Sequence, residues 1–102
     1  MIDALRALVE VESPSADPAA CLACVEVADE LAFRLLGERG ERVEADGRVH
    51  LRWRFGSRPR VLLIGHLDTV WPTGTLARWP FEVHEGRASG PGIFDMKAGV
   101  VQ

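Results

Sequence analysis

The chain has 102 residues, of which 47% are apolar and 26% are charged, and its formal net charge is −3 at pH 7. These values are typical of one soluble globular domain and exclude the disordered and fibrous classes. Because the 12 Lys and Arg residues are mixed with 15 acidic ones, no basic surface is indicated. We therefore expect neither nucleic acid nor a membrane as partner.

The amino terminus lacks the features of a secretion signal. Asp3 stands where a signal peptide needs a basic region, and no apolar run approaches the roughly 20 residues of a membrane span. We therefore expect a cytoplasmic protein.

Two helices are predicted in the first 40 residues. Ile2, Leu5, Leu8 and Val11 recur at three-residue spacing and predict a short helix, which the Ser-Pro-Ser segment at 13–15 ends.

The second helix has clearer boundaries. Asp17 is a plausible N-cap with Pro18 at the first helical position, and Gly37 or Gly40 ends the pattern. Its apolar residues occupy one face, which we expect to be core: Leu22, Val25, Ala28, Leu31, Leu35 and Leu36.

Strands are predicted after Gly40. The alternation over residues 43–55 around the Asp46-Gly47 turn predicts a hairpin with one wet face, and the apolar run 61–64 (VLLI) predicts a strand buried on both faces. The expected fold class is therefore α/β, with two helices, a β-hairpin and a central buried strand.

The remainder is rich in Gly and Pro. Only a short alternation around a turn at Glu85-Gly86 interrupts it, and long irregular segments in compact domains are usually functional. Residues 95–102 predict the first turns of a helix without a C-cap, so we expect a truncated chain that stops inside an element.

His66 and Asp68 are the first candidate site residues. They follow the predicted buried strand, where open α/β sheets place ligand sites, and residues two apart on an extended backbone face the same side. Imidazole is a good zinc ligand, and a nearby carboxylate can orient it. By itself, the His-x-Asp pattern also fits a polar strand end.

Asp95 is a second candidate. It could act as an N-cap for the helix that follows, which would contribute about 1 kcal/mol. That interpretation leaves Gly90 and Gly92 unexplained, since closely spaced glycines permit backbone angles and close approaches denied to other residues. They favour a carboxylate held in a constrained position.

These motifs together resemble one family. Residues 66–70 (HLDTV), 79–81 (WPF), 90–92 (GPG) and 95–97 (DMK), with 12–15 (ESPS) before them, are similar in order and spacing to the zinc-dependent metallopeptidase family of glutamate carboxypeptidase, aminoacylases, acetylornithine and succinyl-diaminopimelate deacylases and carnosinases. The similarity covers nearly the whole chain. It implies that residues 1–102 are the amino-terminal, incomplete part of a zinc-peptidase-like catalytic domain.

The resemblance also implies roles for individual residues. His66 would be a ligand of one metal, Asp95 would bridge two metals, and Asp68 would be the catalytic-site residue that orients His66. A cis peptide is implied after Asp95. Two zinc ions are implied in the complete enzyme, with cobalt or manganese as substitutes, and together they activate a shared water.

The implied reaction is cleavage of amide bonds in N-acyl amino acids or small peptides. The family's adjacent Glu-Glu pair, a further acidic ligand and a late His are absent here. We therefore expect the isolated chain to be inactive. The resemblance allows a homodimer for the full-length form.

Three other features of the sequence have alternative interpretations. Cys21 and Cys24 form a C-x-x-C pair that could serve a small redox protein, although small buried residues on a helix fit them better. A non-catalytic interaction domain would expose Trp71 or Trp79 on an open apolar patch. The polar residues of the predicted hairpin at 82–85 (EVHE) fit a solvated strand better than a metal site.

Overall fold

The computed structural model describes residues 1–102 and has an α/β composition, as predicted. Two two-stranded antiparallel sheets, β1–β2 and β3–β4, are separated in the chain by irregular segments. In order, the elements are α1 (Ile2–Val9), α2 (Pro18–Leu36), β1 (Glu41–Ala45), β2 (Arg48–Arg52), α3 (Thr75–Arg78), β3 (Glu82–His84), β4 (Arg87–Ser89), the kinked turn η1 (Ile93–Lys97) and α4 (Ala98–Val101).

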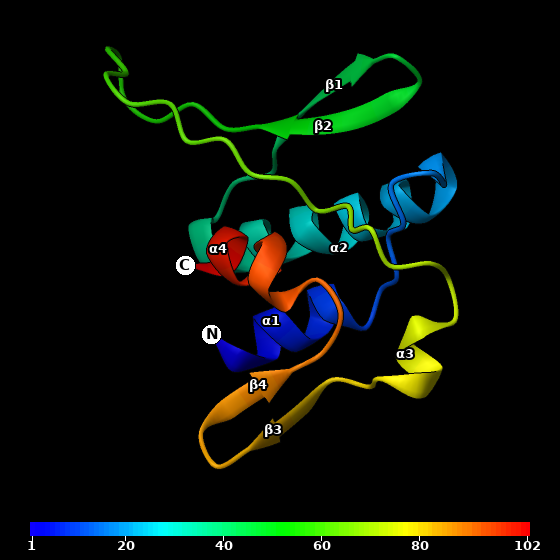
Figure 1. The fold of residues 1–102 in the computed structure, drawn as a ribbon. Helices are drawn as coiled ribbons and strands as arrows, with labels where there is room; N and C mark the ends of the chain where they lie inside the picture. Colours follow the sequence, from blue (N-terminus) through cyan, green and yellow to red (C-terminus); the bar gives the residue numbers. More distant parts are fainter.

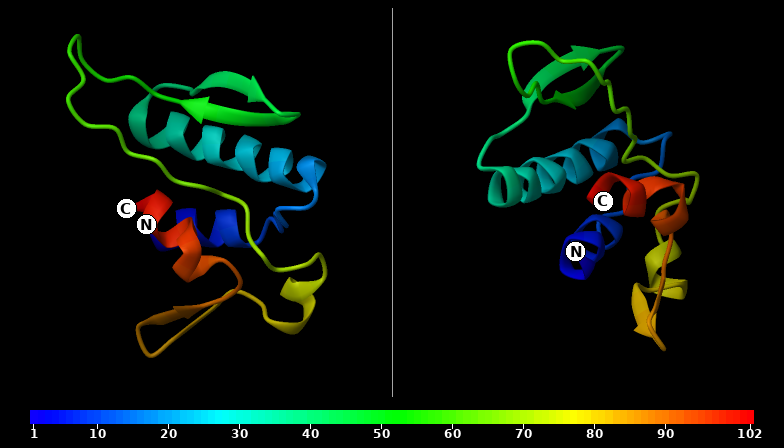
Figure 2. Two further views of the ribbon diagram at one scale, coloured as in Figure 1. Left: turned by 45° about the horizontal axis from the view of Figure 1, so that its top comes forward. Right: turned by 90° about the vertical axis from the view of Figure 1, so that its left-hand side faces the viewer.

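The long helix α2 lies between two layers. The β1–β2 hairpin covers one side of it, while α1 and the carboxyl-terminal turns lie on the other (Figure 1). The β3–β4 hairpin and α3 extend beyond α1 at the far end, and the two chain termini lie close together (Figure 2). No helix is both long and apolar enough to cross a membrane.

The boundaries of α2 confirm the predicted capping residues. The Asp17 side chain accepts hydrogen bonds from the backbone N–H groups of Ala19 and Ala20, and Pro18 occupies the first helical position. Gly37 ends the helix with a φ of 78°, a left-handed conformation that glycine adopts without steric cost.

The core is small and centred on α1. Leu5 and Val9 are buried with Phe81, which precedes β3, and partly buried apolar residues of α3, η1 and α4 pack around them. Cys24 of α2 is fully buried, as expected of a small core residue. The core prediction for α2 is wrong near both ends of the helix, because Leu22, Leu35 and Leu36 are exposed.

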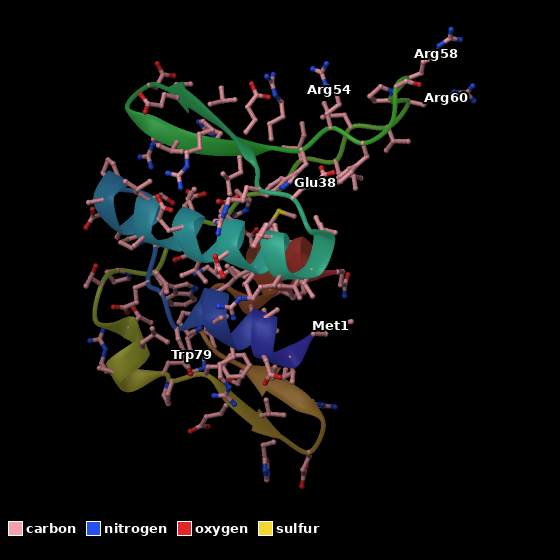
Figure 3. All side chains as sticks on the ribbon, turned by 180° about the vertical axis from the view of Figure 1, so that it is seen from behind. Met1, Glu38, Arg54, Arg58, Arg60 and Trp79 are labelled. Atoms are coloured by element: carbon pink, nitrogen blue, oxygen red, sulfur yellow. The ribbon has the colours of Figure 1, made fainter.

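Both hairpins are present. Ala45 pairs with Arg48 across the predicted Asp46-Gly47 turn, and His84 pairs with Arg87 across Glu85-Gly86. The first hairpin ends at Arg52, earlier than predicted. Beyond it the chain forms a loop whose arginine side chains project away from the helices (Figure 3), and these are Arg54, Arg58 and Arg60.

The predicted central buried strand is wrong for this structure. Residues 61–64 form no strand, and their side chains are 76% (Val61) to 89% (Leu63) exposed. The physical reason is that an apolar run becomes a buried strand only beside neighbouring strands that pair with it and layers that cover it. The four strands of this chain pair only within their own hairpins.

Candidate functional site

A short parallel bridge holds the segment that carries His66 and Asp68. The Thr69 N–H donates to the Ser13 carbonyl at 2.8 Å, and the Ser15 N–H donates to the Thr69 carbonyl at 2.9 Å. The Ser13 hydroxyl also donates to the Leu67 carbonyl at 2.7 Å. The end of the first helical region, not a central sheet, therefore positions this segment.

His66 stands between the two candidate carboxylates. Its Nδ1 lies 3.0 Å from the Asp68 carbonyl oxygen and 3.3 Å from Asp68 Oδ1. Its Nε2 lies 2.9 Å from Asp95 Oδ1, across 29 positions of sequence. The structure thus brings together the three residues singled out from sequence, with each ring nitrogen facing a different carboxylate.

Asp95 does not act as an N-cap. Its backbone is extended, with φ −127° and ψ 97°, and its side chain makes no capping hydrogen bond. The Asp95–Met96 peptide is cis, as the family resemblance implies. The predicted helix over 95–102 is therefore helical only in α4, because residues 95 and 96 form the kink that directs the Asp95 carboxylate toward His66.

Lys97 fixes this kink to the first helix. Its side chain is buried at 1% exposure, and Nζ donates to the carbonyls of Leu8 at 2.8 Å and Val11 at 3.0 Å. Those carbonyls lie at and just beyond the end of α1, where helical backbone acceptors lack intrahelical partners. Burial lowers the pKa of Lys97.

The electrostatics of the site follow from these contacts. Partial burial by itself lowers the pKa of His66, but the hydrogen bonds to Asp95 and Asp68 and the charges of these two carboxylates outweigh it, so the pKa lies above its usual value of 6.5. The hydrogen bond from Ser15 lowers the pKa of Asp68, and the charges of His66 and Arg48 act in the same direction.

These residues face an open cleft of about 460 Å³. Trp71 and Trp79 line the cleft with a T-shaped contact whose ring centroids are 5.2 Å apart, and the Trp79 indole N–H donates to Ser89 Oγ at 2.8 Å. The tryptophans therefore lie beside His66 and Asp95, which argues against an interaction domain that presents them on an open patch.

Three residues of the site were not identified from sequence. Ser15 contacts Asp68, Lys97 anchors the kink, and Glu12 accepts backbone N–H groups of Gly74 and Leu76, both at 2.9 Å. In the sequence, the segment 12–15 indicates a helix ending and a family motif, but no contact with the site. Its cluster of polar side chains around a proline was the available signal that it contacts another part of the chain.

The polar residues of the second hairpin take no part in the site. Glu82, His84 and Glu85 are exposed on or next to β3, as expected of a solvated strand. Cys21 and Cys24 are free, and burial is the main cause that raises the pKa of Cys21. A reactive redox cysteine needs a lowered pKa, so this observation argues against the redox alternative.

The donor atoms present fit a metal in part. His66 Nε2 and Asp95 Oδ1, 2.9 Å apart, are close enough for both to contact one zinc ion at about 2.0–2.2 Å. The chain holds no group of three or more His, Cys, Asp or Glu side chains able to bind a metal. Two side chains that could contact one metal ion thus lie side by side.

The carboxyl-terminal part of the chain is similar to a known family of peptidases. Residues 62–102 match the model of peptidase family M20/M25/M40. The family resemblance of the motifs is thereby confirmed for this segment, which is similar to peptidases of that family.

A curated protein is similar to this chain over a short stretch. Carboxypeptidase G2 of Pseudomonas sp. (strain RS-16) is 51% identical over 39 residues, which are 38% of this chain and 9% of the relative. The match thus spans a small part of the relative's length.

Proposed function

We propose that this chain contributes part of the metal centre of a hydrolase that uses two zinc ions to cleave amide bonds of N-acyl amino acids or small peptides, in the manner of a carboxypeptidase. The observation that supports the proposal most strongly is the approach of His66 Nε2 to Asp95 Oδ1 within the cleft. Cobalt or manganese could replace zinc at such a site.

The residues of the chain have distinct roles in this proposal. His66 would hold a metal through Nε2, the Asp95 carboxylate would be shared between the two metals, and Asp68 would orient the His66 ring at Nδ1. When bound, the metals lower the pKa of a water and polarise the amide carbonyl. A carboxylate at Nδ1 also raises the basicity of the ligating nitrogen.

The chain does not carry the full catalytic apparatus. A general base must accept a proton from the water and deliver it to the leaving amine, and no adjacent Glu-Glu pair occurs in the sequence. We therefore propose that the activity belongs to a larger protein containing this segment, while residues 1–102 alone hydrolyse no acyl-amino acid.

A chimera tests the proposal. Residues 62–102 of this chain, the segment that matches the family model, replace the corresponding segment of carboxypeptidase G2, and carboxypeptidase activity is measured with added zinc. Retained activity that is abolished by His66→Ala or Asp95→Ala in the graft, but not by Glu82→Gln, supports the proposal. An active graft that tolerates both His66→Ala and Asp95→Ala would overturn it.

A further inference from the structure

Ser15 contacts the site through Asp68 Oδ2, the carboxylate oxygen other than the one nearest His66 Nδ1. Its hydroxyl lies 2.5 Å from Asp68 Oδ2 and 3.0 Å from the Thr69 carbonyl oxygen. A serine hydroxyl has one proton to donate, and the shorter contact is with the charged acceptor. The proton is therefore directed to Asp68.

This bond determines how the Asp68 carboxylate is turned. With Oδ2 held by Ser15, the other oxygen, Oδ1, faces His66 Nδ1 at 3.3 Å. Nδ1 also faces the Asp68 carbonyl oxygen at 3.0 Å. Two acceptors at Nδ1 favour a ring proton on that nitrogen, while Asp95 Oδ1, 2.9 Å from Nε2, favours a proton on the other. The orientation of Asp68 therefore shifts the balance between the two tautomers.

Arg48 supports Ser15 from the first hairpin. Its Nη2 donates to the Ser15 carbonyl at 2.6 Å, while its Nη1 lies 3.7 Å from Cys21 Sγ. The Ser15 backbone is thereby bonded on both sides, by Arg48 and by Thr69. These two hydrogen bonds restrain the Ser15 backbone and so fix the position from which its side chain contacts Asp68.

We propose that Ser15 is a positioning residue for the metal ligand His66: by holding Asp68 with Oδ1 toward Nδ1, it favours the ring proton on Nδ1 and so makes Nε2 more available to a metal. This inference rests on the proposed function, since it concerns the same site. A second carboxylate, Asp95, lies at Nε2 and competes for the ring proton. Without Ser15, the proton moves toward Nε2.

The test compares ring tautomers in variants of this chain. Long-range ¹H–¹⁵N NMR of His66, at a pH where the ring is neutral and without metal, shows which nitrogen carries the proton. We expect a larger fraction of the Nδ1–H form in the native chain than in Ser15→Ala. Zinc affinity, measured by calorimetry, is expected to fall about 10-fold in this variant.

Ser13→Ala is the matched control. The Ser13 hydroxyl bonds the same segment through the Leu67 carbonyl at 2.7 Å but does not touch Asp68. Its loss should lower stability without changing the tautomer. If Ser15→Ala does not fold, Ser15→Thr and Ser15→Val provide the comparison, because these side chains have one shape and differ in the hydroxyl.

The outcomes separate the two proposals. If the His66 tautomer were the same in the native chain and in the variants without the Ser15 hydroxyl, the role of Ser15 would be overturned, even if the zinc affinity changed. A tautomer shift accompanied by zinc binding away from His66 would support the role of Ser15 and contradict the proposed metal site.

Discussion

Gly92 approaches Thr69 so closely that a Cβ atom at position 92 would lie 2.5 Å from Thr69 Cγ2. Gly92 also has a φ of 75°, which L side chains rarely adopt. Gly92→Ala therefore combines a backbone cost with a steric clash against the segment that carries His66. We expect its free energy of unfolding to fall by about 2–4 kcal/mol, measured by urea denaturation.

Gly86→Ala provides the control for the backbone term. Gly86 has a φ of 76°, and a Cβ there would meet no atom within 4 Å. Gly86→Ala should therefore lower the free energy of unfolding by only about 1–2 kcal/mol. Thr69→Ser removes the clashing methyl group and should recover part of the loss at position 92. Equal destabilisation by the two Ala variants would contradict the clash.

Lys97→Met tests the anchor between the kink and α1. The substitution keeps the length of the side chain but removes the donor to the Leu8 and Val11 carbonyls. Leaving buried acceptors without a partner costs about 1–3 kcal/mol. The expected result is a corresponding loss in the free energy of unfolding, with altered NMR shifts at Asp95.

Arg78→Met removes a positive charge at an exposed position at the end of α3 and serves as the control. Its stability should change by less than about 0.5 kcal/mol. An unchanged stability in Lys97→Met would show that the buried ammonium contributes nothing net, since its desolvation would then cancel its hydrogen bonds.

Asp29 is expected to make stability depend on pH. This residue is 3% exposed and accepts the Gly40 N–H at 2.7 Å and Arg39 Nη1 at 3.0 Å. Burial alone raises the pKa of Asp29, but these bonds outweigh it and bring the pKa below 3.8. A lowered pKa stabilises the fold above the unfolded-state value, and this contribution is lost as the pH falls through the folded-state pKa.

Asp29→Asn should remove this contribution. At neutral pH the variant should be less stable by about 1–3 kcal/mol, and its difference from the native chain should shrink as the pH falls below about 4. Urea denaturation between pH 7 and the acid range measures this difference, with Glu82→Gln on the exposed hairpin as the control. A difference that stays constant with pH would refute the assignment.

The exposed apolar segment at 61–64 should promote self-association. Leu63 is 89% exposed, next to three other apolar side chains that no strand or helix covers. Leu63→Glu is expected to increase the fraction of monomer in sedimentation velocity runs at high concentration. Val83→Glu, on a half-exposed position of β3, should have a smaller effect. A native chain that stays monomeric would contradict this prediction.

Local signals were the most predictable part of the fold. The caps of α2 and the two hairpin turns depend on short-range chemistry, so Asp17, Gly37 and the Asp46-Gly47 turn could be recognised directly. The run 61–64 was mispredicted because apolar composition indicates a buried strand only if partner strands are present. The same limit applies to Leu35 and Leu36, whose exposure depends on what packs beside them.

The site was predictable where its residues belong to motifs. His66, Asp68 and Asp95 stand out by type and by the glycines around them, and the structure brings them together. Ser15 and Lys97 also lie in motif segments, 12–15 and 95–97, but the motifs gave neither residue a role. Their roles depend on pairings across 53 and 89 positions of sequence, and a lone serine or lysine carries no sign of its partner.

The central claim is that His66 and Asp95 face the same metal ion. Its most direct test is a titration of the ¹⁵N-labelled chain with zinc, followed by NMR of the histidine rings and the backbone. We predict weak binding that shifts His66 Nε2 and the amides around Asp95, and that is lost in both His66→Ala and Asp95→Asn while His50 and His84 stay unchanged. A zinc response centred on Cys21 and Cys24 or on His84, or one that persists in both variants, would contradict the claim.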